Sequence, residues 1–224
     1  MEPQRKTGYH AGMNTPTPVG LGPVYAFTGI YIAVFSAVSI AAGTPGLAVY
    51  LALMAVLVPV LYRVHRHFPF GAGLAWAFSA WGLVHMTGGL VPIPGGWSGE
   101  GARSVLYSWW LIPGYLKYDQ VVHAYGFGIT TWLCWHILEG ALRSPGGSPL
   151  RPTPALLMLC AAGGMGFGAL NEVVEFIFTL VEPETNVGDY TNIGWDLVAN
   201  LVGSLVAVVI IQRAHRPRNV LVPA

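Results

Sequence analysis

Six long apolar stretches, separated by short polar or Pro- and Gly-rich segments, organise the chain. They cover residues 23–42, 46–62, 71–91, 118–142, 153–181 and 191–212. A helix needs about 20 consecutive apolar residues to cross a bilayer, and the short second stretch runs into Tyr62–His67, whose long basic side chains can reach the headgroups. We therefore predict an all-α polytopic membrane protein, a six-transmembrane-helix bundle that forms a single integral membrane domain over residues 1–224.

The positions of Lys and Arg predict the orientation of this bundle. With the N-terminus inside, nine of the eleven Lys and Arg lie in inner segments: Arg5, Lys6, Arg63, Arg66, Arg143, Arg151, Arg213, Arg216 and Arg218. The outer segments hold the other two, Arg103 and Lys117. Cytoplasmic loops of membrane proteins carry an excess of these residues. We therefore expect both termini to be cytoplasmic.

The composition agrees with the membrane class. Hydrophobic residues make up 54% of the chain and charged residues 9%, whereas soluble domains carry about 25% charged residues. The formal net charge is only +1, so nothing points to a nucleic-acid partner. Membrane lipids are the expected partners, and the oligomeric state stays open.

One connection is long, the predicted outer loop 92–117. It is rich in Trp and Tyr, which gather at membrane–water interfaces. We interpret it as an interfacial anchor, with a mobile lid over a site as the alternative.

Polar and ionisable residues fall at similar depths on four of the stretches. At 1.5 Å per helical residue all of them except Asp119, which begins the fourth stretch, lie roughly 8–14 Å below the outer ends. They are His85, Asp119, His123, Glu172, Glu175, Asp196 and Asn200. Within a helix they pair at i,i+3 or i,i+4 and so share a face: Asp119 with His123, Glu172 with Glu175, Asn171 with Glu175, and Asp196 with Asn200. Ionisable groups inside a bilayer are costly and mark functional sites by default. We predict that they meet inside the bundle.

Imidazoles and carboxylates in one place suit a divalent metal such as zinc, iron or manganese. The predicted metal ligands are His85, His123, Glu172, Glu175 and Asp196. The predicted catalytic residues are His123, Glu172 and Glu175, and Asp119, Asn171 and Asn200 would orient the ligands. The alternatives are metal-free acid–base chemistry with His123 as the base, proton or ion movement, and a hydrogen-bonded polar core that only fixes helix register. Glu182, Glu184 and Asp189 form an acidic outer loop that we interpret as solvated surface, from which Asp189 could reach the site.

Short motifs at these positions resemble a known family. His85-Met-Thr-Gly-Gly89, Asp119-x-x-x-His123, Glu172-x-x-Glu175 and Asp196-x-x-x-Asn200 occur in the same order in the YjdF-like bacterial inner-membrane proteins. The second half is also similar to VanZ-like membrane proteins. The resemblance covers about residues 70–210. It implies a multi-pass protein of the bacterial inner (cytoplasmic) membrane with a polar intramembrane site, and it names no reaction.

The leading functional hypothesis is a metal-dependent, membrane-embedded enzyme that acts on a lipid or lipid-linked substrate, because lipid headgroups reach this depth of the outer leaflet. A proton- or ion-coupled transporter is the alternative. A structural membrane protein with a polar core is the second alternative.

Overall fold

The computed structural model describes residues 20–44, 46–99, 104–142, 149–181 and 190–215. Within these residues the chain is mostly helical, as predicted, and forms six α-helices. They are α1 (Gly22–Ala42), α2 (Leu47–His67), α3 (Ala72–Leu90), α4 (Tyr118–Leu142), α5 (Pro154–Val181) and α6 (Tyr190–Ala214). The predictions for the two ends of the chain and for the acidic loop with Glu182, Glu184 and Asp189 lie outside the described residues.

The helix ends follow the predicted stretches closely except in α2. This helix continues past residue 62 to His67, and its last turn holds His65, Arg66 and His67. Cationic side chains are favourable at a helix C-terminus, where carbonyl groups carry partial negative charge. The basic run that the sequence placed at the interface is therefore the last turn of the helix itself.

Four of the described helices are long and apolar enough to cross a membrane: α1, α2, α5 and α6. Helices α3 and α4 fall outside this set, because Trp, Gly, His and polar residues lower their mean hydropathy. These two helices also carry His85, Asp119 and His123. A helix surrounded by other helices can hold polar groups that face the bundle interior instead of lipid.

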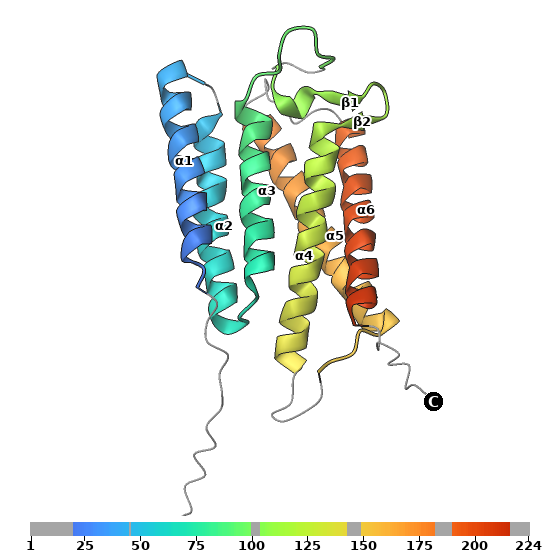
Figure 1. Cartoon of the computed structure of the whole chain (residues 1–224). Coiled ribbons are helices and arrows are strands. Elements are labelled where there is room, and N and C mark those ends of the chain that lie inside the picture. The colour runs from blue at the N-terminus through green and yellow to red at the C-terminus, as the bar shows by residue number, and fades with distance from the viewer. Residues whose placement is uncertain (1–19, 45, 100–103, 143–148, 182–189, 216–224) are drawn as a thin grey trace, which may run out of the picture.

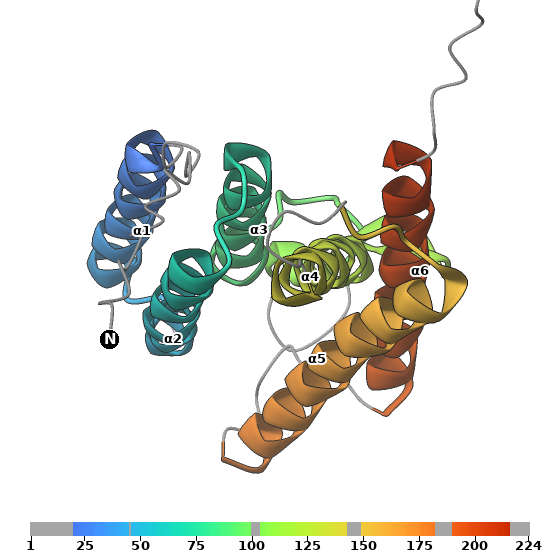
Figure 2. The same ribbon diagram turned by 90° about the horizontal axis from the view of Figure 1, so that it is seen from below.

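Helix α4 lies at the centre of the arrangement (Figure 1) and packs on α3, α5 and α6. Helices α1 and α2 lie on the far side of α3, against which both pack. Seen along the bundle, α5 and α6 cross each other, so their ends diverge (Figure 2). Polar side chains from α4, α5 and α6 can therefore meet in the diverging half without forcing the three backbones together.

Small residues set the distance between α4 and α6. A Cβ atom at Gly203 of α6 would collide with the backbone carbonyl of Ala124 in α4. A Cβ atom at Gly128 of α4 would lie 3.0 Å from the carbonyl oxygen of Gly203. Small residues at helix contacts in membranes allow this close backbone approach.

Residues 91–117 connect α3 to α4 at the end of the bundle that the sequence predicts to be outer, called the outer end below. This connection contains a 3₁₀ turn, η1 (Leu106–Ser108), and two short antiparallel strands, β1 (Trp110–Ile112) and β2 (Leu116–Lys117). Gly114 turns the chain between the strands with φ +75°, a conformation that favours glycine. In its described part, the predicted interfacial loop is thus an ordered segment folded over the bundle.

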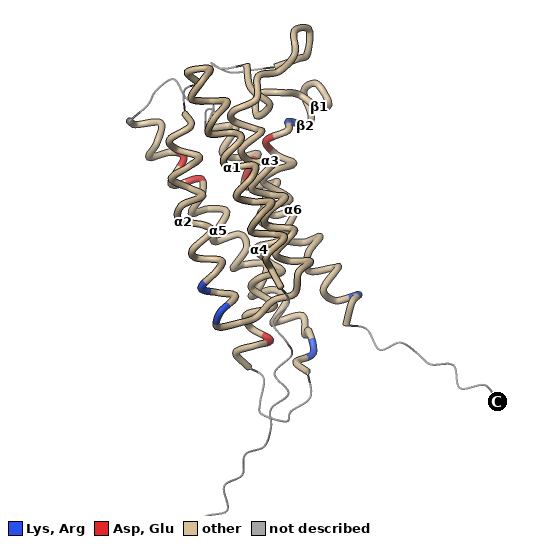
Figure 3. Tube along the Cα trace, turned by 60° about the vertical axis from the view of Figure 1, so that its left-hand side comes forward, with Lys and Arg blue, Asp and Glu red and all other residues tan. Residues whose placement is uncertain are grey.

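Charged residues divide between the two ends of the bundle (Figure 3). Among the described residues, Lys117 is the cation at the outer end, and Arg63, Arg66, Arg151 and Arg213 lie at the opposite end. Four of the five described acidic residues lie in the outer half, and Glu139 lies in the other half.

Candidate functional site

The His123 imidazole is the centre of a polar cluster in the outer half of the bundle. Its Nε2 atom lies 3.5 Å from Oδ1 of Asp119 and 3.9 Å from Oε1 of Glu175. Its Nδ1 atom lies 3.3 Å from Oε1 of Glu172 and 3.3 Å from Oδ1 of Asn200. Only 7% of the His123 side chain is exposed. One imidazole from α4 therefore contacts polar groups of α4, α5 and α6.

Helical spacing and close packing bring these groups together. Asp119 and His123 share a face of α4 because they are four residues apart. Asn200 approaches from α6 opposite Gly168 of α5, where a Cβ atom would lie 2.7 Å from Nδ2 of Asn200. Glycine at position 168 thus leaves the space that the amide occupies. We call Asp119, His123, Glu172, Glu175, Asp196 and Asn200 the His123 cluster.

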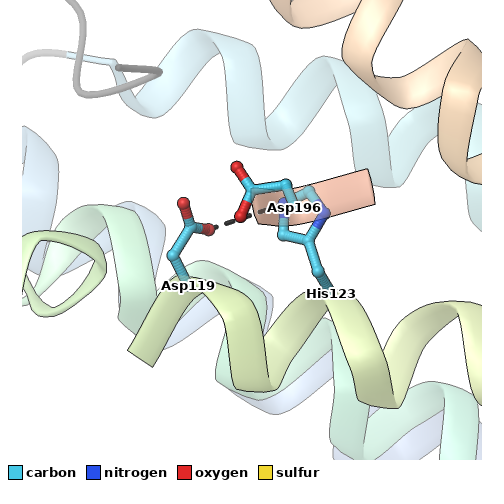
Figure 4. Close-up of side chains that lie close together, drawn as sticks. All are labelled: Asp119, His123 and Asp196. Atoms are coloured by element: carbon cyan, nitrogen blue, oxygen red, sulfur yellow. Dashed lines mark ion pairs between the residues drawn. The ribbon is translucent and has the colours of Figure 1, made fainter. Parts of the chain in front are cut away.

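Three members of the cluster are arranged like ligands of one cation. One ligand atom each from Asp119, His123 and Asp196 lies within 4.8 Å of the others (Figure 4). Oxygen and imidazole nitrogen are suitable ligands for zinc, iron or manganese. The sequence had assigned Asp119 an orienting role, but the structure places its carboxylate in this group of three. Glu172 lies on the other side of the imidazole, facing Nδ1.

Several buried polar atoms of the cluster form no hydrogen bond within the described part of the chain. They are both carboxylate oxygens of Glu172, Oδ1 of Asp196 and Nδ2 of Asn200. The contact between Glu172 and His123 has ion-pair distance without hydrogen-bond geometry. Glu172 is 4% exposed, and Asp196 and Asn200 are fully buried. Leaving a buried polar group without a partner costs about 1–3 kcal/mol, and more for a charged group. The carboxylate oxygens without partners could therefore bind a cation or protons.

Asn192 at the start of α6 is a further member of the site that the sequence reasoning missed. Its Nδ2 atom donates to Oδ2 of Asp196 at 2.6 Å and to Oδ2 of Asp119 at 3.4 Å. Its Oδ1 atom accepts a hydrogen bond from Nζ of Lys117 at 3.2 Å. One amide thus fixes two carboxylates and connects them to residues 91–117 between α3 and α4, called the outer segment below. The i,i+4 spacing of Asn192 and Asp196 was the available signal.

Asn171 has the local contact that its spacing predicted. Its Nδ2 atom donates to Oε1 of Glu175 at 2.6 Å. Glu175 is more accessible than Glu172, with 24% of its side chain exposed.

His85 is not part of the group of three. Its Nδ1 atom forms a short hydrogen bond with the Tyr107 hydroxyl, and its ring stacks on Trp81 with centroids 4.9 Å apart. The glycines of the His-x-x-Gly-Gly motif make room for this arrangement. A Cβ atom at Gly88 would lie 2.6 Å from the Tyr107 ring, and one at Gly89 would collide with Tyr50. The motif therefore makes room for an aromatic group around the predicted ligand His85, formed by Tyr50, Trp81 and Tyr107.

Tyr107 belongs to the aromatic group around His85 and also contacts the Tyr118 ring at the start of α4. Burial raises the pKa of its phenol well above the ordinary value, and the nearby Tyr50, Asp119 and Glu175 raise it further. The hydroxyl therefore stays protonated near neutral pH. Tyr107 belongs to η1, so the outer segment contributes a polar group at the outer ends of α3 and α4, on which η1 packs.

Comparison with curated proteins and with solved structures gave no match. A family profile described as "Predicted membrane protein (DUF2238)" matches residues 23–217, which is most of the chain. The chain belongs to the DUF2238 family of predicted membrane proteins.

Proposed function

We propose that the chain is one membrane domain with six spans, both termini in the cytoplasm, in the inner membrane of a bacterium. Helices α3 and α4 would be the two spans shielded by their neighbours. The four described Arg residues at one end of the bundle support this orientation. The resemblance of the short motifs to YjdF-like and VanZ-like proteins supports the bacterial inner membrane.

We further propose that the His123 cluster binds a divalent metal ion. The observation that carries this proposal is the convergence of ligand atoms from Asp119, His123 and Asp196 within 4.8 Å of one another, together with the buried Oδ1 atom of Asp196, which has no hydrogen-bond partner among the described residues. A carboxylate at the centre of a membrane costs about 2.5–3.5 kcal/mol on insertion scales, and the cluster contains four acidic residues. A divalent cation would offset that cost. Asp119, His123 and Asp196 would be its ligands, and Glu175 would lie beside them, 3.9 Å from Nε2 of His123, without binding the ion.

The other side of the imidazole would orient this ligand. Histidine ligands usually give their second ring nitrogen to a carboxylate or carbonyl group, which fixes the tautomer. Oδ1 of Asn200 is hydrogen-bonded to Nδ1 of His123 at 3.3 Å and suits this role, and Oε1 of Glu172 lies at ion-pair distance, 3.3 Å, from the same nitrogen. The sequence predicted that Glu172 is a metal ligand and a catalytic residue. In this proposal it is a positioning residue instead. His85 would not be a ligand.

The proposed activity is that of an enzyme acting on a lipid or lipid-linked substrate. A bound metal ion can polarise an ester or phosphoryl oxygen and lower the pKa of a bound water to about 7. Glu175, which is partly exposed, would accept the proton of that water. The depth of the cluster, roughly 8–14 Å below the outer ends of the helices, places it within reach of outer-leaflet headgroups.

Transport is less well supported, because the polar groups end half-way along the bundle. Thr131 and Ser204 continue the line of buried polar residues one turn inward from Asn200. Beyond them the buried residues include Ala207, Ile211 and Trp135, which offer no chain of ionisable groups for a proton or ion.

The metal proposal predicts about one bound divalent ion per chain in detergent-purified protein. His123→Ala and Asp196→Asn should each lose it, because each removes a ligand. His136→Ala is the matched control, since His136 lies on the same helix and its Nε2 atom is 2.8 Å from the carbonyl oxygen of Pro69, away from the cluster. Elemental analysis of the purified proteins measures the outcome.

Lipid analysis of cells tests the enzymatic part. Cells that produce wild-type protein should differ in lipid composition from cells that produce His123→Ala, and His136→Ala should behave like wild type. A well-folded wild-type protein without metal, together with an unchanged lipid profile in the His123→Ala cells, would contradict the proposed function.

A further inference from the structure

The outer segment covers the His123 cluster on the water-facing side. Tyr107 is anchored to α3 through the His85 imidazole, and η1, to which it belongs, packs on both α3 and α4. Lys117 of β2 is hydrogen-bonded to Asn192 of α6, on the opposite side of the cluster. The segment thus reaches from α3 to α6 and is held at both ends by polar contacts.

The segment is also fixed by its own backbone. Leu106 donates a backbone hydrogen bond to the carbonyl of Val91 at 3.0 Å, and an isolated bridge pairs Pro92 with Val105. Strand β2 leads directly into α4, which carries Asp119 two residues later. These contacts make the segment a fixed cover over the cluster.

The inner side of the cluster is closed by helix packing. Thr131 and Ser204 are fully buried below it. Gly164 of α5 lies against both hydroxyls: an added Cβ atom would collide with Oγ1 of Thr131 and lie 3.0 Å from Oγ of Ser204. Little space for a solute remains in that direction.

The side beside α5 is more open. Helix α5 packs on α4 and α6, and it has no comparable contact with α3 in the described part of the chain. The side chain of Glu175 is 24% exposed there, against 4% for Glu172 one turn earlier. The neighbours of Glu175 on α5 are strongly exposed apolar residues: Val173, Val174, Phe176 and Ile177. In a bilayer these side chains would contact hydrocarbon. They project from the faces of α5 on either side of the one that carries Glu175, so the exposed edge of Glu175 borders a lipid-facing surface.

From this arrangement we infer that the cluster is reached from the bilayer, beside α5 on the side of α3, and that its ligand is a membrane lipid. The apolar surface of α5 would contact the acyl chains. The polar headgroup would first meet Glu175 and then the rest of the cluster. A water-soluble substrate would have to pass the cover formed by Tyr107 and Lys117. The inference rests on the proposed function for the role of the cluster, and it adds that the lipid enters the cluster from within the bilayer.

Carbodiimide labelling tests the route directly. A carbodiimide adds to a protonated carboxyl group, and the adduct rearranges to a stable N-acylurea that retains every atom of the reagent. Unsealed membranes containing metal-free protein would be treated either with dicyclohexylcarbodiimide, which partitions into lipid, or with the water-soluble ethyl-dimethylaminopropyl carbodiimide. Peptide mass spectrometry then gives the labelling rate of each carboxyl group.

Glu175 should react at least about ten times faster with dicyclohexylcarbodiimide than with the water-soluble reagent. The two cyclohexyl rings of dicyclohexylcarbodiimide are apolar and concentrate that reagent in the bilayer. Glu172, being buried, should react more slowly than Glu175 with both reagents. The Tyr107→Ala variant opens the cover. In this variant the labelling rate of Glu175 by the water-soluble reagent should rise, and its labelling rate by dicyclohexylcarbodiimide should stay nearly unchanged. Glu175→Gln confirms the assignment of the labelled peptide.

Equal or faster labelling of Glu175 by the water-soluble reagent in wild-type protein would overturn the inference, and so would the absence of Glu175 labelling by both reagents. Because the labelling uses metal-free protein, its result is independent of the metal analysis. A failure of lateral access and a failure of metal binding can therefore be told apart.

Discussion

Glu172→Leu is expected to make the metal-free protein more stable than wild type. Glu172 is 4% exposed, and neither of its carboxylate oxygens has a hydrogen-bond partner among the described residues. A buried polar group without a hydrogen-bond partner costs about 1–3 kcal/mol. Glu172 is also one of four carboxylates around a single imidazole, so its removal relieves repulsion between like charges and leaves His123 with other carboxylates. The midpoint of thermal unfolding in detergent, measured after chelator treatment, should therefore rise. In the presence of excess metal, the unfolding midpoint of the variant should instead lie below that of wild type, because the variant has lost a group that orients His123.

Glu175→Leu is the matched control one turn along the same helix. Glu175 accepts a hydrogen bond from Asn171 at 2.6 Å and is partly exposed. Its removal leaves the Asn171 amide without this partner, which costs about 1–3 kcal/mol if the amide stays buried. We therefore expect no stabilisation. If Glu172→Leu instead destabilises the metal-free protein as strongly as a core truncation does, the cluster is a structural polar core.

Gly203→Val is expected to prevent folding of the bundle. The added Cβ atom would collide with the backbone carbonyl of Ala124, and backbone atoms of a helix cannot rotate away as a side chain can. Overpacking usually costs about 1–3 kcal/mol and occasionally more, and here it separates α4 from α6 and so pulls apart the His123 cluster. The purified yield of monodisperse protein, followed by size-exclusion chromatography in detergent, should fall sharply.

Gly194→Val provides the comparison within α6, because a Cβ atom at Gly194 meets nothing within 4 Å. It should purify like wild type. A Gly203→Val protein with wild-type yield and unfolding temperature would show that α4 and α6 do not approach as closely as described.

Much of the candidate site could be predicted because a membrane protein has few polar residues to place. Polar side chains at equal depth on apolar helices have little choice but to turn inward, since lipid offers them no partner. The spacing of Asp119 and His123 on one helix and of Asp196 and Asn200 on another fixed which faces would meet. Depth and face together were sufficient to collect these residues around His123.

His85 shows where this reasoning stops. It has the same depth as the others, but its ring is held by Tyr107 and Trp81, and Tyr107 comes from the outer segment, whose path no periodicity indicates. Asn192 was missed for a related reason. It lies in the first turn of α6, where an amide is common at a membrane interface. Only the structure shows that Lys117 and the carboxylates of Asp119 and Asp196 surround it.

The sequence by itself determined the membrane class, the helices and the depth of their polar residues, because each of these depends on local hydropathy and helical period. Only the tertiary structure decided which side of the His123 ring each carboxylate faces. It also decided that α5 and α6 cross, that Glu175 is accessible while Glu172 is buried, and that the outer segment covers the cluster. These features depend on contacts between residues far apart in the chain, such as Gly168 with Asn200 and Lys117 with Asn192. Such contacts are set by packing, which leaves no periodic signal in any one segment.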